Sequence, residues 1–133
     1  MKKLASLIIL LTMLLSLCSC GEYVSSYSAL GLVKNQTSHS CEASFLSFNG
    51  KLVFKLKKSD QGEEGDISYS VEVEAGAVDL YYDIYGTKQS LAHVEAGENI
   101  SARGGYIEGG KTVYIFIEGT DGAKGKVSVE LDN

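Results

Sequence analysis

From Cys41 to the end of the chain, apolar and polar residues alternate with a period of two. Turn residues (Gly, Asn and Asp) separate the alternating runs, and β-branched and aromatic residues fill the apolar positions. This period matches a half-buried β-strand and does not match the 3.6-residue period of an amphipathic helix. The sequence therefore predicts an all-β domain, and 133 residues are enough for one domain only.

The dipeptide Asn49-Gly50 lies between two such runs, 41–48 and 51–57. Asn-Gly suits the positive φ angles of a type I′ turn, so we expect a hairpin here. In that hairpin Phe45 is opposite Phe54. The same face carries Cys41, Ala43, Leu52 and Leu56, while Lys51 and Lys55 point away.

A second hairpin is predicted with its turn at 74–77. It places four apolar pairs in succession on one face: Val73/Val78, Val71/Leu80, Tyr69/Tyr82 and Ile67/Ile84. The other face carries Glu72, Asp79 and Asp83, as expected for an antiparallel ribbon with one solvated side.

Shorter alternating runs follow at 90–95, 99–102, 112–118 and 126–131. Together with the two hairpins they make about eight short strands. This number and spacing indicate an antiparallel two-sheet β-sandwich over residues 41–133, with a jelly roll as one arrangement that fits.

The first twenty residues have a different character. Two lysines precede an apolar block, Leu4 to Leu17, which ends in small residues and cysteine. As a helix, 14 residues would span about 21 Å, less than the roughly 30 Å hydrocarbon core of a bilayer. The order of these regions is typical of a secretory signal.

Leu17, Ser19 and Cys20 resemble the lipobox of bacterial lipoproteins, which has Leu at −3, a small residue at −1 and a cysteine that becomes the lipidated first residue. Cys18 is an alternative modified residue, but it would place the bulky Leu17 at −1, so Cys20 is preferred. The resemblance implies a signal peptide at 1–19 and a lipidated N-terminus at Cys20. Residues 20–40 are rich in Ser, Asn, Gln and Thr and are expected to form mainly a tether, with docking of Leu30, Leu32 and Val33 onto the domain as an alternative for that part.

By the same resemblance, Cys20 would carry a diacylglycerol thioether and acyl chains such as palmitate. Two or more chains give stable anchoring, so the expected partner is the lipid bilayer and the expected location is the extracytoplasmic face of a bacterial membrane. Lys2 and Lys3 would leave with the signal, and the formal net charge would change from −5 to −7. Such a charge argues against nucleic-acid binding.

Catalysis has little support in the sequence. The two histidines are His39 and His93, and Cys41 is the one thiol left after processing. A His39/Cys41 pair is chemically conceivable, but a free cysteine in this position is more typical of a core residue. No cofactor is expected, and no spacing matches a metal site. We therefore expect a non-enzyme, with a small hydrolase as the least favoured alternative.

Outward-facing aromatic residues supply the candidate ligand face. Tyr81 and Tyr85 lie four apart on one predicted strand, and Tyr114 and Phe116 lie on another. Asp79 and Asp83 add hydrogen-bond acceptors beside them. Such a face could bind a glycan or a protein if both strands share a sheet. The sequence thus predicts a binding or accessory module, with a structural or protective envelope lipoprotein as the alternative.

Overall fold

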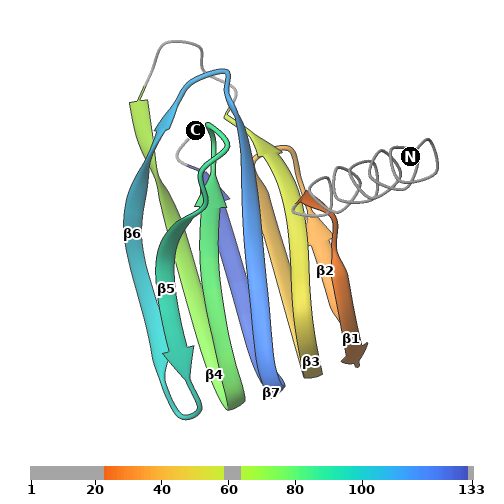
Figure 1. Cartoon of the computed structure of the whole chain (residues 1–133). Helices are drawn as coiled ribbons and strands as arrows, with labels where there is room; N and C mark the ends of the chain where they lie inside the picture. The colour runs from red at the N-terminus through yellow and green to blue at the C-terminus, as the bar shows by residue number, and fades with distance from the viewer. Residues whose placement is uncertain (1–22, 59–63, 132–133) are drawn as a thin grey trace, which may run out of the picture.

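The computed structural model describes residues 23–58 and 64–131. They form seven antiparallel strands (Figure 1): β1 (Ser26–Leu30), β2 (Val33–Gln36), β3 (Ser40–Lys57), β4 (Glu64–Asp83), β5 (Gln89–Glu95), β6 (Asn99–Glu108) and β7 (Thr112–Leu131). The all-β, antiparallel fold class is confirmed.

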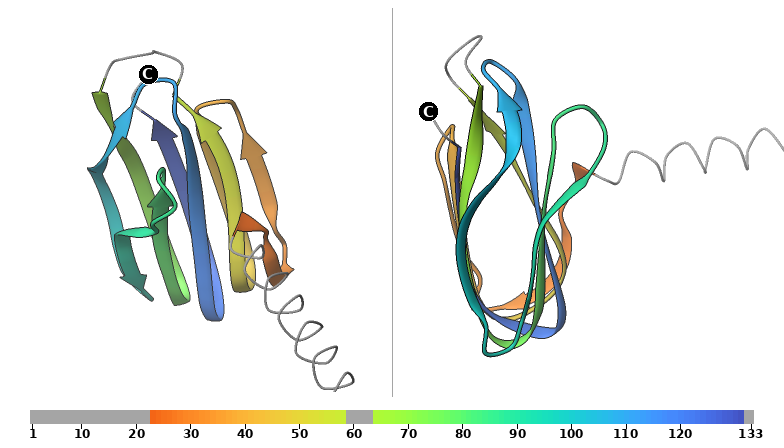
Figure 2. Two further views of the ribbon diagram at one scale, coloured as in Figure 1. Left: turned by 45° about the horizontal axis from the view of Figure 1, so that its top comes forward. Right: turned by 90° about the vertical axis from the view of Figure 1, so that its left-hand side faces the viewer.

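Three of these strands are long and fold back on themselves. Strand β3 pairs with β7 from Ser40↔Glu130 to Lys57↔Thr112, with register shifts only near Phe48. Strand β4 pairs with the other edge of β7 over an equally long register. Each long strand therefore gives one arm to each of two layers, which close at one end of the molecule and open at the other (Figure 2).

The shorter strands complete the two layers. Strands β1 and β2 pair with successive parts of β3, and β5 and β6 pair with successive parts of β4. The front layer contains β1, the second arms of β3 and β4, the first arm of β7, and β5. The back layer contains β2, the first arms of β3 and β4, the second arm of β7, and β6. This is a β-sandwich whose layers share their three central strands.

The line where the chain bends from one layer to the other is called the crease below. Residues with positive φ mark it in every ribbon: Gly31, Gly50, Gly76, Gly97, Asp121 and Gly122. At Gly76, φ is 70° and an added Cβ would lie 2.4 Å from the carbonyl oxygen of Thr120. Only glycine accommodates both the backbone angle and this approach.

The core fills the space between the layers. Its members come from inward positions of both arms, and they include Val71, Val73, Val78 and Leu80, as the alternation predicts. Phe48 is also fully buried, although it was not assigned to that face, because the shift in register near it reverses the alternation.

Both predicted hairpins were wrong as pairings. Phe45 pairs with Gly125 and Phe54 with Ile115, so the two rings lie in different layers. Likewise, Val73 pairs with Gly125 and Val78 with Gly119. The alternation predicts which residues face the core. It does not distinguish a hairpin from a bent strand, because both arrangements bury the same residues. Strands β3 and β4 are bent strands and not hairpins because both arms of each form backbone hydrogen bonds with β7.

The Asn49-Gly50 dipeptide accordingly forms a bend within β3. Its Asn49 Oδ1 accepts a hydrogen bond from Gly122 N at 2.9 Å, which joins two ribbons at the crease. The runs predicted at 112–118 and 126–131 are likewise arms of the single strand β7.

Residues 26–36 were expected to be tether and instead form β1 and β2. Ala29 and Leu32 from this segment pack against the core, which explains why the segment adds to the sheet. The predicted signal peptide and Cys20 lie outside the described residues. Among the residues described, no helix is long and apolar enough to cross a membrane.

Candidate functional site

The predicted aromatic residues come from neighbouring strands of the front layer. Tyr81 pairs with Phe116, and Asp83 pairs with Tyr114. Asp79 lies in the next outward row, opposite Glu118. We call the outward surface formed by Tyr81, Tyr114, Phe116, Asp79 and Asp83 the aromatic face. The condition that both strands share a sheet is met.

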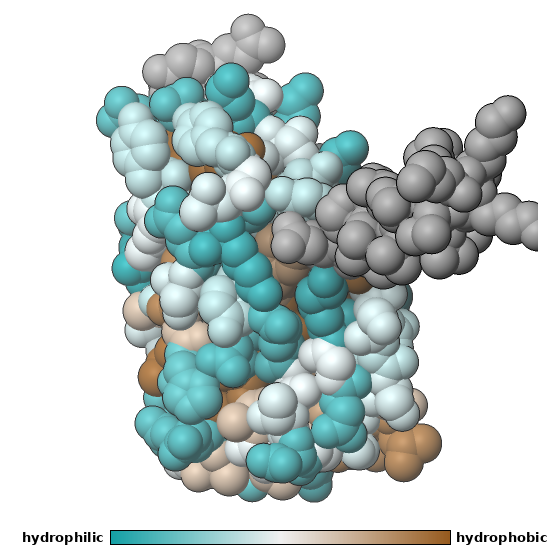
Figure 3. Space-filling view, viewed as in Figure 1, coloured by the Kyte–Doolittle hydropathy of each residue, from teal (hydrophilic) through white to brown (hydrophobic). Residues whose placement is uncertain are grey.

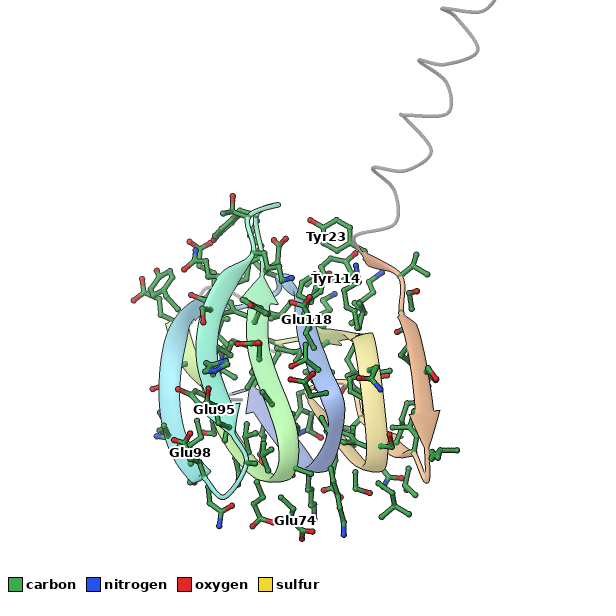
Figure 4. All side chains as sticks on the ribbon, turned by 60° about the horizontal axis from the view of Figure 1, so that its bottom comes forward. Tyr23, Glu74, Glu95, Glu98, Tyr114 and Glu118 are labelled. Carbon is green, nitrogen blue, oxygen red and sulfur yellow. The ribbon has the colours of Figure 1, made fainter. Side chains whose placement is uncertain are left out.

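Tyr23 covers part of this face (Figure 4). Its ring centroid lies 4.5 Å from that of Tyr114 and 6.0 Å from that of Phe116. Phe116 is only 2% exposed although it lies outside the core between the layers. Phe116 therefore points outward as predicted but is not an open ring. The residue that covers it comes from the segment expected to be a tether.

Asp83 is also buried, with 3% of its surface exposed. Its Oδ2 accepts a hydrogen bond from the Tyr23 hydroxyl at 2.9 Å, and its Oδ1 accepts one from Gly86 N at 2.7 Å. The second bond closes the turn that ends β4. Asp83 thus holds the N-terminal segment and the turn together, as expected for a buried carboxylate with satisfied acceptors.

Tyr85 lies within that turn and is not part of the aromatic face. It is 61% exposed. A hydrogen bond with Glu108 on β6 raises the pKa of the Tyr85 hydroxyl, with desolvation as a smaller cause. The prediction that Tyr81 and Tyr85 share a strand failed because the Asp83 turn ends the strand two residues earlier.

Lysines surround the remaining rings. Lys88 Nζ lies 4.2 Å from the Tyr81 ring centroid and forms an ion pair with Glu118 at 2.6 Å. Lys88, Lys51, Asp83 and Glu118 border a hollow of about 440 Å³ with Phe116 at its floor. Figure 3 shows hydrophilic side chains crossing this front face over a narrower hydrophobic strip. Ligand binding here stays a prediction.

His93 lies at the margin of this face, opposite Asp79. Its Nδ1 is 2.6 Å from Asp79 Oδ1, and its Nε2 is 3.4 Å from Glu95 Oε1. The hydrogen bond with Asp79 is the main cause that raises the pKa of His93, and Glu95 adds to the effect. The group is exposed and has the arrangement of a surface ion pair.

The back layer carries a larger hollow that the sequence reasoning missed. It has a volume of about 590 Å³ and crosses the outward face of all the strands in that layer. One row of side chains in register across it is Asn35, Glu42, Ser128, Ser70 and Ser101. Ser40, Glu130, Ser68 and Arg103 form the next row. We call this hollow the polar groove.

Some of the groove's polar groups bond to one another. Arg103 Nε donates to Ser68 Oγ at 3.0 Å, and Ser128 Oγ donates to Glu42 Oε2 at 3.4 Å. Ser70 and Ser101 have no side-chain hydrogen bond to another described residue and remain available to a ligand. The signal in the sequence was the recurrence of serine at outward positions of several strands. It was missed because serine at an outward position also fits the ordinary alternation of a half-buried strand.

Cys41, the candidate nucleophile, lies in the core between the layers. Cys41 is buried, and its burial raises the pKa of the thiol to about 12, so the thiolate is not populated near neutral pH. Across residues 23–58 and 64–131, no group of three or more His, Cys, Asp or Glu side chains is arranged so that it could hold a metal ion.

Comparison with known proteins shows similarity to solved structures only. No protein-family model and no curated protein matches the sequence. Family 29 carbohydrate-binding modules are among the similar solved structures. One complexed with mannohexaose has a TM-score of 0.44 and 12% identity, covering 80% of this chain and 78% of that chain. One complexed with cellulohexaose has a TM-score of 0.42 and 11% identity, with the same coverage. These values assign neither ligand nor site residues to this chain.

Proposed function

We propose that this protein is a lipid-anchored, extracytoplasmic lipoprotein whose β-sandwich is a non-catalytic binding module for a hydroxyl-rich ligand, a glycan. The observation that carries the proposal is the polar groove. Its rows of small hydroxyl groups, with an amide, two carboxylates and a guanidinium, offer the donors and acceptors that sugar hydroxyls require.

The groove's geometry suits an extended ligand. Neighbouring strands are about 4.8 Å apart, so a chain lying across them meets a new polar side chain at each strand. Serine side chains are short, and the longer Glu42, Glu130 and Arg103 rise beside them. No tyrosine or phenylalanine ring stacks from the outward positions of the two rows, so hydrogen bonds would supply most of the affinity.

Lipid anchoring rests on the resemblance at Leu17, Ser19 and Cys20. Metabolic labelling with a fatty acid tests it. Labelling should disappear in Cys20→Ala and persist in Cys18→Ala. The reverse result would move the modified residue to Cys18, and the absence of label in the unsubstituted protein would refute the anchor.

A glycan array with the purified domain tests the ligand class. Ser70→Ala with Ser101→Ala should weaken binding about 30-fold, since each lost hydrogen bond is worth about 1 kcal/mol. The matched control is Ser26→Ala with Ser90→Ala, which removes two hydroxyl groups outside the groove. Equal binding by both variants would exclude the groove, and Tyr81→Ala with Tyr114→Ala would then test the aromatic face.

A second candidate is a structural or protective envelope lipoprotein that binds another protein. It is favoured by exposed apolar side chains along the β1–β2 edge, Leu30 and Val33, together with Leu46 on β3. Exposed apolar edges are sites of strand addition by partner chains. A protein recovered from solubilised membranes and lost with Leu30→Ser and Val33→Ser would support this candidate over the glycan.

A further inference from the structure

Tyr23 places the N-terminal end of the sandwich close to the proposed anchor. Its ring and hydroxyl are fixed on Tyr114 and Asp83, and β1 begins three residues later. Only residues 21 and 22 separate Tyr23 from Cys20 in the sequence. At about 3.5 Å per residue the two Cα atoms are at most roughly 10 Å apart, so a lipidated Cys20 would hold this part of the domain at the bilayer surface.

Lysines gather next to this point. Lys55 pairs with Tyr114, the residue under the Tyr23 ring, and Lys57 pairs with Thr112 on the same outward face. Lys111 precedes Thr112, and its carbonyl accepts a hydrogen bond from Lys58 N at 3.4 Å. All three side chains are exposed, and none forms an ion pair with another residue that the structure describes. We call Lys55, Lys57 and Lys111 the lysine edge.

Carboxylates lie at both ends of the arms. At the open end Glu64 pairs with Glu108, on the β4–β6 side away from the lysine edge. Glu74, Glu95, Glu98 and Asp121 are all exposed at or beside the crease. Figure 4 shows Glu74 at the end of the molecule away from Tyr23. The lysine edge is the local feature that matters here, because it lies beside Tyr23, where an anionic surface would be nearest to the proposed anchor.

We propose that the lysine edge contacts the phosphate groups of anionic phospholipids beside the anchor, and that this contact directs the crease away from the bilayer. The inference rests on the lipid anchoring proposed above. Each lysine close to an anionic membrane surface contributes a modest attraction that decays within a Debye length.

The test uses the lipidated protein in phosphatidylcholine vesicles with and without phosphatidylglycerol. A fluorophore is attached at Thr87→Cys, in the loop after β4 at the open end, or at Ala96→Cys, at the crease. Cys41 is buried and should not react. Lipids with a nitroxide headgroup then quench a fluorophore that lies near the surface.

With phosphatidylglycerol, the label at position 87 should be quenched more than the label at position 96. Lys55→Gln with Lys57→Gln should lower the equilibrium constant for this orientation about 30-fold and largely equalise the two labels. The matched control, Lys124→Gln with Lys126→Gln, removes the same charge near the crease and in the back layer, so it should keep the difference.

Equal quenching of both labels in the unsubstituted protein would overturn the inference. So would a difference that persists in Lys55→Gln with Lys57→Gln, or one that does not depend on phosphatidylglycerol. Fatty-acid incorporation is measured on the same preparation. Its absence would overturn the anchoring itself, whereas its presence with equal quenching would overturn only the orientation.

Discussion

Single side chains at the front layer connect segments that are far apart in the sequence. Tyr23 packs on Tyr114 and Phe116 from β7 and donates a hydrogen bond to Asp83 at the end of β4. One residue thereby covers an apolar ring and satisfies a buried carboxylate. Both contacts depend on the residue's being an aromatic with a polar end.

Tyr23→Phe should lower the free energy of unfolding by about 1–2 kcal/mol, because Asp83 loses one of its two hydrogen-bond donors. Tyr23→Ala should cost more, since Phe116 also loses its cover. Urea unfolding measures both. The matched control is Tyr27→Phe, whose hydroxyl makes no side-chain hydrogen bond in the described structure. An equal cost for both Phe variants would contradict the role of the Asp83 bond.

His93 makes stability depend on pH. Its pKa in the folded state is raised above its ordinary value of about 6.5, mainly by the hydrogen bond with Asp79. Its contribution is therefore fully present below about pH 6.5 and is lost as the pH rises through the folded-state pKa. Thermal melts should show this decline, and His93→Gln should remove it.

Titration of His93 by NMR provides the independent check. Asp79→Asn should bring the pKa of His93 back toward the ordinary value. If the pKa of His93 does not fall in Asp79→Asn, the contact seen in the structure does not control the titration.

At the level of single residues, the sequence predicted which side of the sheet a side chain lies on but did not predict whether an outward side chain is exposed. Alternation placed Val71 and Leu80 inside and Tyr114 outside, because it reports only the direction of a side chain from the sheet. Phe116 also points outward, yet Tyr23 covers it, and no local pattern encodes a contact between positions 23 and 116. The serines of the polar groove were missed because they form one surface only when the strands are in their observed lateral order, which the sequence does not give.

Among the strands, the common feature is the crease. Each ribbon bends at nearly the same level, and a residue with positive φ occurs at each bend. The repeated Glu-Ala-Gly pieces at 74–76 and 95–97 lie there. Bulges allow a strand to bend while its neighbours stay paired, so a sheet can fold over without losing its ladders.

Gly76→Ala should lower the free energy of unfolding by about 3 kcal/mol, because the new Cβ meets the Thr120 carbonyl and the backbone angle is unfavourable for alanine. Gly97→Ala is the matched control, since φ is 88° there and no atom lies within 4 Å of the added Cβ. It should cost about 1 kcal/mol. Equal costs in urea unfolding would show that backbone angle alone determines both.

The sequence located most of these elements but joined them incorrectly. The runs on either side of Asn49-Gly50 and of 74–77 are strands with the expected inward faces. Their pairing depends on β7. Every residue of β3 that pairs with β7 has its partner more than fifty residues later in the sequence. Local turn chemistry favoured hairpins, and non-local hydrogen bonding to β7 gave bent strands instead.

For the molecule as a whole, β1 and β2 form one complete edge of the sandwich. They cover the outer edge of β3, and Ala29 and Leu32 close the core beneath it. The described part of the sandwich therefore includes Tyr23, and only residues 21 and 22 lie between Tyr23 and the proposed lipidation site in the sequence.

A chain starting at residue 37 should melt at a lower temperature than one starting at residue 23, and it should aggregate, because the edge of β3 and part of the core become exposed. Differential scanning calorimetry and light scattering measure the two effects. Unchanged melting would mean that residues 26–36 are dispensable to the fold, as a tether would be.

Strand β7 is the last in the chain, yet it lies in the middle of both layers, between β3 and β4. Neither of those strands can complete its hydrogen bonds until Thr112–Leu131 has been synthesised. The strand that joins the two halves of the sandwich is therefore the last of the described strands to be made. Until this strand is present, a growing chain can form only the pairings of β1 and β2 with β3 and of β5 and β6 with β4. A product truncated before Thr112 would keep two groups of strands with no strand to join them.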